Sequence, residues 1–532
     1  MLFGFYVILD YLNVPQLLGF SSDRINMDFF DVFLNSVIVV VLYIITYYFV
    51  DRRQIQKDAN SKDTAGVLLL YTYKECLDNL RIVWNSEWVK KYIVPKVDGN
   101  KPMTENKIIM NLQRLPFSSR NQKIGGNIVM DKSEKRFERD IESFLISPAG
   151  GYTQFSGQDA EGDWVHTRQH NVAKCIYMDV LCEFIAKTQP KEWAKYTKYY
   201  GDSAPDKLYH RLETTITNQG LLYVLRNGIE DMGCKLKVCF FKPESDLNPL
   251  ATERYEANIL GCTRQFRYST ANTNTIDMVL SVNGIPVVAL ELKNQLTGQD
   301  YICAINQYKS DRSSKEFAFR LNHRFLVYFA VDLYEARMTT QLADGKTRFL
   351  PFNQGSNGAG VTGGAGNPQN PNGYATSYLW EEVLQRDSLL DLIHRFISFA
   401  KEKEEVVKNG VSKTVTKEKM IFPRYHQYDV VRKIMADVKH NGVGQNYLIQ
   451  HSAGSGKSNS IAWIAYRLAS VHDADNNGLF DSVIVVTNRV VLDSQLQDTI
   501  NSFEHQVGLV EAIDDKKNSR SLAEAINDKK RI

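Results

Sequence analysis

The stretch Thr275–Lys293, TIDMVLSVNGIPVVALELK, holds two strand-like apolar runs on either side of Asn283-Gly284. Asn-Gly between two such runs is a strong β-hairpin signal, because both residues accept the positive φ angles of a two-residue turn. Side chains alternate along a strand, so Glu291 and Lys293 share one face. This hairpin is the part of the sequence that most restricts the fold.

The register of this hairpin decides which polar side chains meet. A strict two-residue turn pairs Val282 with Ile285 and therefore Asp277 with Leu290, which leaves Asp277 on the face opposite Glu291. We predict instead a three-residue loop, a bulge or a bend, any of which brings Asp277 opposite Glu291.

Asp277, Glu291 and Lys293 then form a candidate metal-dependent nuclease site. Two carboxylates on adjoining strands hold Mg²⁺, which prefers oxygen ligands and polarises a phosphoryl oxygen. Lys293 would orient the nucleophile or stabilise charge on the phosphorane. The spacing alone is a weak signal, since surface strands carry such residues by chance. Here Glu291 and Lys293 end a very apolar strand, which a solvated face explains poorly.

A second motif is the glycine loop His451–Asn459, HSAGSGKSN. We expect a short buried strand at Tyr447–Gln450 before it and a helix at Ser458–Val471 after it. Backbone N–H groups at the positive end of that helix would cradle ATP phosphates, with the Lys457 ammonium on the β/γ oxygens and the Ser458 hydroxyl on Mg²⁺. The residues expected to bind nucleotide are Gly454, Ser455, Gly456, Lys457 and Ser458. The alternative is a glycine-rich turn with a chance lysine.

Two further segments fit a nucleotide-binding domain. Gln427 lies about thirty residues before Lys457 and is either an adenine-reading group or an exposed helix residue. Ser482–Thr487 is a second apolar strand candidate.

Composition limits the remaining interpretations. The chain has 532 residues, 43% hydrophobic and 23% charged, which is ordinary globular composition for about three domains. A net charge of +3 is too small to indicate nucleic-acid binding by itself. Seven cysteines without a C-x-x-C pair favour a reducing cytosol and argue against structural zinc.

Val32–Val50 carries no charged residue and nearly spans a hydrocarbon core of roughly 30 Å. We predict a transmembrane helix within an N-terminal segment 1–60; a buried helix or strand is the alternative. Basic residues follow it at Arg52 and Arg53, which puts the nuclease-like and motor-like parts in the cytoplasm. Residues 61–129 remain unassigned.

From residue 130 the pattern indicates an α/β domain over 130–345. A helix begins near Ser133, and strands are expected at 236–241, 276–282, 286–292 and 324–331. Residues 346–420 combine a Gly/Asn-rich linker or surface loop with helical segments that extend from Leu379 to Lys403. Residues 421–532 hold the nucleotide loop. Four basic residues would either neutralise phosphates or form a solvated helix face: Lys309, Arg312, Lys315 and Arg320.

Together these motifs resemble the restriction (R, or HsdR) subunit of type I restriction-modification systems, over about Met130–Ile532. The resemblance rests on Phe137–Tyr152, Ile276-Asp277, Asn283–Pro286, Glu291–Lys293, Asn306–Tyr308, Tyr425–Gln427, His451–Ser458 and Val485–Arg489. It implies a PD-(D/E)xK endonuclease followed by the first part of a RecA-like superfamily 2 translocase. It also implies partners: duplex DNA and the methylation and specificity subunits.

By the same resemblance, Asp277, Glu291 and Lys293 are the catalytic triad and Gln307 matches a glutamine that follows it. Some members have tyrosine four residues later, where this chain has Asp311. An early helical glutamate often completes the site, and Glu138 is preferred over Glu142.

The sequence stops 75 residues after Lys457, before a DExH box. We therefore expect ATP binding without efficient hydrolysis, and a split, truncated or fused product in which a restriction subunit beginning near Met130 follows a membrane-containing leader. The preferred function is Mg²⁺-dependent cleavage of unmodified duplex DNA. The alternatives are a non-catalytic, membrane-tethered remnant that binds ATP or DNA, and a stand-alone repair-type nuclease.

Overall fold

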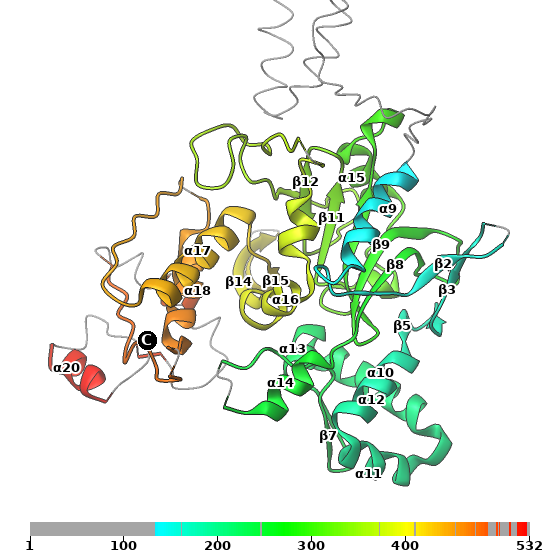
Figure 1. Ribbon diagram of the computed structural model, residues 1–532, viewed down its shortest axis with the longest axis horizontal. Helices are drawn as coiled ribbons and strands as arrows, with labels where there is room; N and C mark the ends of the chain where they lie inside the picture. Colours follow the sequence, from blue (N-terminus) through cyan, green and yellow to red (C-terminus); the bar gives the residue numbers. More distant parts are fainter. Residues whose placement is uncertain are drawn as a thin grey trace, which may run out of the picture. The chain divides into compact units, whose positions relative to one another are not determined.

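The computed structural model describes residues 134–487 apart from 161, 245–246, 372, 409–410, 453 and 474, together with 496–497, 499–500, 510–511 and 519–528. These residues belong to one compact unit, Met130–Ile532 (Figure 1). The predicted membrane segment Val32–Val50 and the unassigned residues 61–129 lie outside the described residues. Within the described part, none of the helices has the length and apolar character needed to cross a membrane.

A mixed seven-stranded sheet forms the centre of the fold, with order β1-β8-β9-β10-β11-β12-β13. Its strands are β1 Thr153–Gln154, β8 Leu260–Arg267, β9 Thr275–Val282, β10 Ile285–Leu292, β11 Val327–Val331, β12 Ala336–Thr339 and β13 Leu350–Pro351. The β1–β8 and β10–β11 pairs are parallel and the others antiparallel. Every residue of β10 is buried, because both faces of the sheet are covered.

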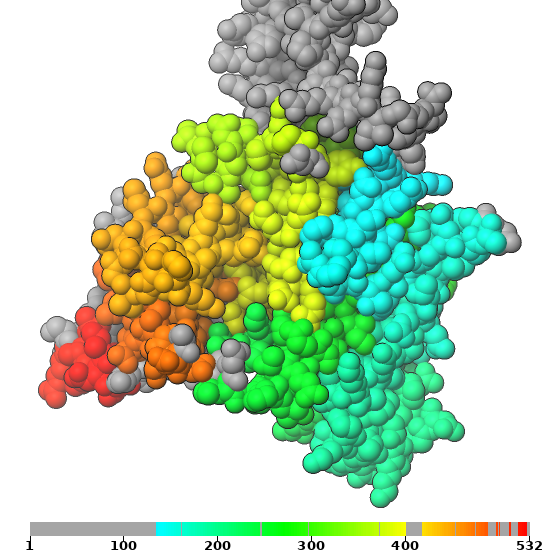
Figure 2. Space-filling view, viewed as in Figure 1, coloured from blue at the N-terminus to red at the C-terminus, as the bar shows by residue number. Residues whose placement is uncertain are grey.

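Helices cover the two faces of this sheet. Alternate residues of β10 join two different apolar clusters: Leu290 packs in one with Phe137 of α9 Glu134–Leu145, and Ala289 in the other with Tyr308 of α15 Tyr301–Ser310. The predicted helix after Ser133 is thus confirmed. Figure 2 shows α9 (cyan) beside the yellow segment near residue 380, where the Phe137 ring contacts Trp380.

The remaining elements surround this core. The helices are α10 Met178–Thr188, α11 Pro190–Tyr200, α12 Ala204–Gln219, α13 Leu221–Asn227, α14 Pro249–Glu256, α16 Arg386–Asp391, α17 Tyr425–Asn441, α18 Lys457–Ser470 and α20 Ser519–Asn527. Short helical turns are η2 Gly201–Ser203, η3 Gln295–Thr297, η4 Phe317–Phe319, η5 Leu379–Val383 and η6 Leu392–Phe396. Short strands are β2 Ser156–Gln158, β3 Trp164–His166, β4 His170–Asn171, β5 Ile176–Tyr177, β6 Ile229–Asp231 and β7 Cys234–Leu236.

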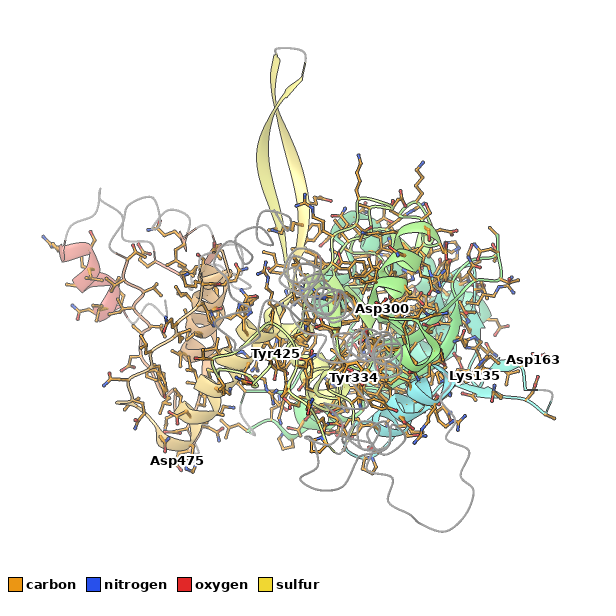
Figure 3. The ribbon with its side chains drawn as sticks, turned by 90° about the horizontal axis from the view of Figure 1, so that it is seen from above. Lys135, Asp163, Asp300, Tyr334, Tyr425 and Asp475 are labelled. Carbon is orange, nitrogen blue, oxygen red and sulfur yellow. The ribbon has the colours of Figure 1, made fainter. Side chains whose placement is uncertain are left out.

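The expected helix from Leu379 to Lys403 is wrong in its second half. Helical structure ends at Phe396, and β14 Ser398–Lys408 pairs with β15 Val411–Ile421 as a long hairpin that projects from the body in Figure 3. Asn-Gly at 409–410 and several β-branched residues on both sides favour strands over helix. The Gly/Asn-rich segment is a loop closed on itself, with Gly355 N–H donating to the Gly366 carbonyl at 2.6 Å.

Four strand predictions also need correction. Residues 237–241 follow β7 without being part of a strand, and Arg324–Leu326 precede β11. Tyr447–Gln450 and Ser482–Thr487 are not strands in the described structure, and Leu448 is 93% exposed. A strand requires a pairing strand for its N–H and C=O groups, and no described strand pairs with either segment.

Candidate functional site

The β9–β10 hairpin brings together the first three candidate residues. Asn283 and Gly284 have φ angles of 50° and 85°, as a two-residue turn requires. Val282 pairs with Ile285, but the register shifts at a bulge between Pro286 and Val288. Of the three alternatives predicted from sequence, the bulge is therefore confirmed.

Because of this shift, Met278 pairs with Leu290, and the next position places Asp277 opposite Glu291. Asp277 is 7% exposed and Glu291 is fully buried. The Leu292 N–H donates to Asp277 Oδ2 at 2.8 Å, and Lys293 Nζ lies 3.4 Å from the same oxygen. The two carboxylates and the lysine thus form one cluster.

Arg312 is a fourth member of this cluster. Its Nη2 lies 2.8 Å from Glu291 Oε1, its Nε donates to the same oxygen at 3.0 Å, and its Nη2 also donates to the Thr275 carbonyl at 2.6 Å. The side chain is 2% exposed. Placing Arg312 on a solvated helix face was therefore wrong. No local spacing predicts the contact, because 21 residues separate Arg312 from its carboxylate partner.

The Glu291 carboxylate is only partly compensated for its burial. Burial raises the pKa of Glu291 well above its ordinary value, and the neighbouring Asp277 carboxylate raises it further, against the opposing effect of Arg312. Glu291 Oε2 is buried and has no hydrogen-bond partner among the described residues. A buried carboxylate oxygen without a donor is destabilised unless a proton or a cation reaches it.

These residues fit a bound Mg²⁺ ion. Mg²⁺ commonly uses one or two protein carboxylates and keeps several waters. Asp277 and Glu291 supply two carboxylates, one with an unpaired oxygen. Within the described ranges, no group of three or more His, Cys, Asp and Glu side chains is arranged to hold a metal. A third protein ligand is thus not preformed.

Glu138 and Glu142 of α9 both contact Arg264 of β8. Arg264 Nε donates to Glu138 at 3.0 Å and its Nη1 to Glu142 at 3.2 Å, and Gln265 Nε2 donates to Glu138 at 3.2 Å. Burial raises the pKa of Glu138 to about 7, and the charge of Asp277 contributes in the same direction. The preference for Glu138 over Glu142 as the helical glutamate of the site stays a prediction.

Gln307 is not brought into the cluster. It is half-buried on α15, and its side chain makes no hydrogen bond with any described residue. The next residue, Tyr308, is buried and donates to the Phe329 carbonyl at 3.3 Å. The role that the resemblance implied for Gln307 stays a prediction.

The glycine loop is a separate site. Gly454 and Gly456 have φ angles of 74° and 83°, and α18 begins at Lys457. Lys457 Nζ donates to the carbonyls of His451 and Ser452, at 3.2 and 3.0 Å. The first turn of α18 has no acidic residue, so its N–H groups and the lysine create a positive potential. The half-buried Ser458 lies in this turn, and Ala453 is outside the described residues.

The start of α17 holds this loop. Gln427 is 3% exposed, accepts from the Arg424 N–H at 2.8 Å and donates to the Gly456 carbonyl at 2.8 Å. His426 Nε2 lies 3.2 Å from the Ser455 carbonyl. The alternative that made Gln427 an exposed helix residue is therefore wrong. An adenine contact by Gln427 stays a prediction.

The two sites, in this order, are typical of proteins that join a nuclease-like α/β domain to a P-loop ATPase domain. Residues 138–347 match the family described as Type I restriction enzyme R protein N terminus, and residues 426–532 match the SWI2/SNF2 ATPase family. The first match contains the Asp277 cluster and the second contains the glycine loop.

Curated relatives agree with this pair of matches. The chain is 27% identical over 259 residues to the type I restriction enzyme HindI endonuclease subunit of Haemophilus influenzae, covering 46% of this chain and 22% of the relative. It is 23% identical over 356 residues to a Methanocaldococcus jannaschii protein provisionally named type I restriction enzyme MjaVIIIP endonuclease subunit. This match covers 61% of this chain and 30% of the relative. The chain thus spans less than a third of these relatives. The resemblance to the type I R subunit is confirmed.

Proposed function

We propose that this chain provides the endonuclease site of a type I restriction R subunit, which cuts unmodified duplex DNA with Mg²⁺ in a complex with methylation and specificity subunits. The proposed fold of residues 130–345 is PD-(D/E)xK. The observation that carries the proposal is the buried cluster of Asp277, Glu291 and Lys293, with one Glu291 oxygen unpaired, inside the region that matches the R protein family.

The side chains of the cluster have distinct proposed roles. When bound by Asp277 and Glu291, Mg²⁺ would polarise a phosphoryl oxygen and lower the pKa of a water. Lys293, on the same strand face as Glu291, orients the attacking water or stabilises charge that develops on the phosphorane. Arg312 holds the Glu291 carboxylate in place through its ion pair with Oε1. Glu138, with a pKa of about 7, is able to exchange a proton with water near neutral pH.

The glycine loop is proposed to bind ATP, which in R subunits drives DNA translocation. Lys457 would exchange its contacts with the His451 and Ser452 carbonyls for phosphate oxygens. The Ser458 hydroxyl would bind the accompanying Mg²⁺. Gln427, which holds the Gly456 carbonyl, fixes the loop against α17.

A second candidate function is a non-catalytic product that binds ATP or DNA without turnover. Two observations favour it. Each carboxylate of the cluster already contacts a cation, and the described residues present no set of three ligand side chains. In that case the cluster would be a structural ion-pair network.

Cleavage of unmodified plasmid DNA separates these functions. The chain is combined with methylation and specificity subunits, ATP and Mg²⁺, and compared with Asp277→Ala and Lys293→Ala. We expect each change to slow cleavage by roughly 10²–10³-fold while DNA binding persists. The matched control Asp202→Ala removes an exposed carboxylate on η2 and should cut at the original rate. Equal cleavage by all four proteins refutes the nuclease proposal. Cleavage that needs no partner subunits points to a stand-alone nuclease.

A further inference from the structure

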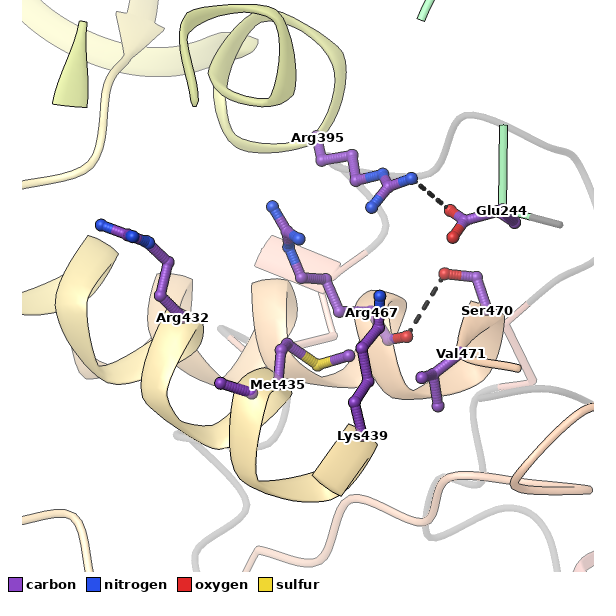
Figure 4. Close-up of a pocket in the computed structure, with 9 residues that line it drawn as sticks. Glu244, Arg395, Arg432, Met435, Lys439, Arg467, Ser470 and Val471 are labelled. Carbon is purple, nitrogen blue, oxygen red and sulfur yellow. Dashed lines mark hydrogen bonds and ion pairs between the residues drawn. The ribbon is translucent and has the colours of Figure 1, made fainter. Parts of the chain in front are cut away.

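A cavity of about 190 Å³ lies between the second half of α17, the end of α18 and the turn η6 (Figure 4). We call it the arginine pocket. Its charged lining is formed by Arg395, Arg432, Lys439, Arg467 and Glu244. It is distinct from both sites described above, because none of these residues belongs to the Asp277 cluster or the glycine loop.

Helical periodicity builds the pocket. Arg432, Met435 and Lys439 lie three and seven positions apart on α17, so they share one face of that helix. Arg467 comes from the last turn of α18, and the buried Met435 and Val471 provide apolar lining. The Arg467 guanidinium also stacks over the Phe396 ring at 4.5 Å, which fixes its position.

The carboxylates nearby do not balance the cations of the pocket. Arg395 pairs with Glu244 at 2.6 Å and with Asp391 at 3.5 Å, and Arg467 pairs with the same Asp391. Arg432 lies 3.6 Å from Glu382, at the outer limit of an ion pair. Three of the four cations thus pair with three carboxylates, and Lys439 pairs with none of them.

Two donors of the pocket remain unsatisfied. Lys439 is exposed and has no ion-pair or hydrogen-bond partner among the described residues. Arg467 Nε is buried without an acceptor in the same part of the chain. Buried guanidinium donors in folded proteins are normally bonded, so an acceptor with several oxygens would stabilise this arrangement.

We propose that the arginine pocket binds a phosphate group. Guanidinium forks match phosphate oxygens in a bidentate manner, and an ammonium adds a point charge. The phosphate belongs either to the backbone of duplex DNA or to a free phosphate compound. The exposed Arg432 and Lys439 form its outer edge, where an extended chain of phosphates has access.

The pocket and the glycine loop share two helices. α18 begins at Lys457 beside the loop and ends at Ser470 beside the pocket, which separates them by roughly 20 Å at 1.5 Å per residue. The first turn of α17 likewise holds the glycine loop, and its later turns line the pocket. A phosphate bound here would contact both helices at the end opposite the nucleotide.

The test measures binding of inorganic phosphate and of a short duplex DNA to the full chain without divalent metal. Every protein carries Lys457→Ala, so the glycine loop contributes little to either signal. Arg432→Gln and Lys439→Gln are compared with Lys433→Gln, which removes one exposed charge from the same helix outside the pocket. Both pocket residues are exposed enough for these changes to leave the fold intact.

We expect each pocket change to weaken phosphate binding about tenfold and the Lys433 change to have little effect. If the bound phosphate belongs to the DNA backbone, each pocket change also reduces the slope of log K for DNA binding against log salt concentration by about one. A loss confined to inorganic phosphate identifies a free phosphate compound. Unchanged binding of both probes, or equal loss in the Lys433 control, overturns the proposal. Because no cleavage is measured, failure of the nuclease proposal would leave these results unaffected.

Discussion

Replacing Arg312 by methionine should destabilise the fold more than any exposed charge change. Arg312 and Glu291 form an ion pair of 2.8 Å in which the side chains are 2% and 0% exposed. Removing one partner of a buried pair leaves the other charge unpaired, at a cost of about 3–5 kcal/mol. Burial already raises the pKa of Glu291, so the carboxyl group is able to take up a proton. We therefore expect Arg312→Met to lower the free energy of unfolding of the metal-free protein by about 3 kcal/mol, near the lower limit of this range.

A double-mutant cycle isolates this interaction. Urea unfolding, followed in EDTA, compares Arg312→Met, Glu291→Gln and the double variant with the unchanged protein. Glu291→Gln alone leaves the arginine without its counter-charge, so the double variant should recover about 2–3 kcal/mol of the summed losses. Arg320→Met, an exposed arginine eight residues later, should change stability by less than about 0.5 kcal/mol. Additive losses in the cycle would refute the assignment of Arg312 as the counter-ion of Glu291.

Three other predictions follow from the same structure. In the metal-free protein the pKa of Glu138 is raised to about 7, against 4.5 in the unfolded chain. The contribution of its protonated carboxyl group to stability is fully present below pH 4.5 and is lost as the pH rises through 7, a change of about 3 kcal/mol. Between pH 4.5 and pH 8 the free energy of urea unfolding should change by about 3 kcal/mol more in the unchanged protein than in Glu138→Gln, whereas equal pH dependence of the two proteins would contradict this. Lys457→Ala should weaken ATP binding at least tenfold in equilibrium dialysis, whereas unchanged affinity would place ATP elsewhere. Gly284→Ala should lower the free energy of unfolding by more than about 1 kcal/mol, because φ is 85° and a Cβ would lie 2.3 Å from the Tyr177 carbonyl oxygen. An unchanged midpoint in thermal unfolding would show that the turn relaxes.

The β9–β10 hairpin was predictable because its signals are local. Asn283-Gly284 specifies the turn, and the apolar runs on both sides specify buried strands. The requirement that Asp277 and Glu291 face the same way predicted an irregularity before any coordinates were known. Its form, a bulge after Pro286, was left open among three alternatives.

Contacts distant in sequence were not predictable in this way. Arg312 reaches Glu291 only because α15 packs against β10 and returns the chain to the end of that strand. Its basic neighbours Lys309 and Lys315 suggested a solvated face, and nothing in the local pattern distinguishes the one residue that is buried. A single sequence contains no signal for this contact.

Predictions from secondary-structure propensity were also wrong where pairing with another strand decides whether a segment forms a strand. Tyr447–Gln450 and Ser482–Thr487 have strand-like composition, but no described strand pairs with either segment. Residues 398–403 look helical because they follow a helix and are rich in Lys and Glu. They form a strand because residues 416–421 pair with them in the β14–β15 hairpin.

The most direct test of the central claim is divalent metal binding at the Asp277 cluster. Binding of Mn²⁺, as a paramagnetic substitute for Mg²⁺, is measured by electron paramagnetic resonance without nucleotide, with and without duplex DNA. Glu291→Gln is compared with the exposed control Glu253→Gln. We predict one site in the unchanged protein and in Glu253→Gln that is lost or weakened at least tenfold in Glu291→Gln. Equal Mn²⁺ binding by all three proteins under both conditions would contradict the assignment of this cluster as a metal-dependent nuclease site.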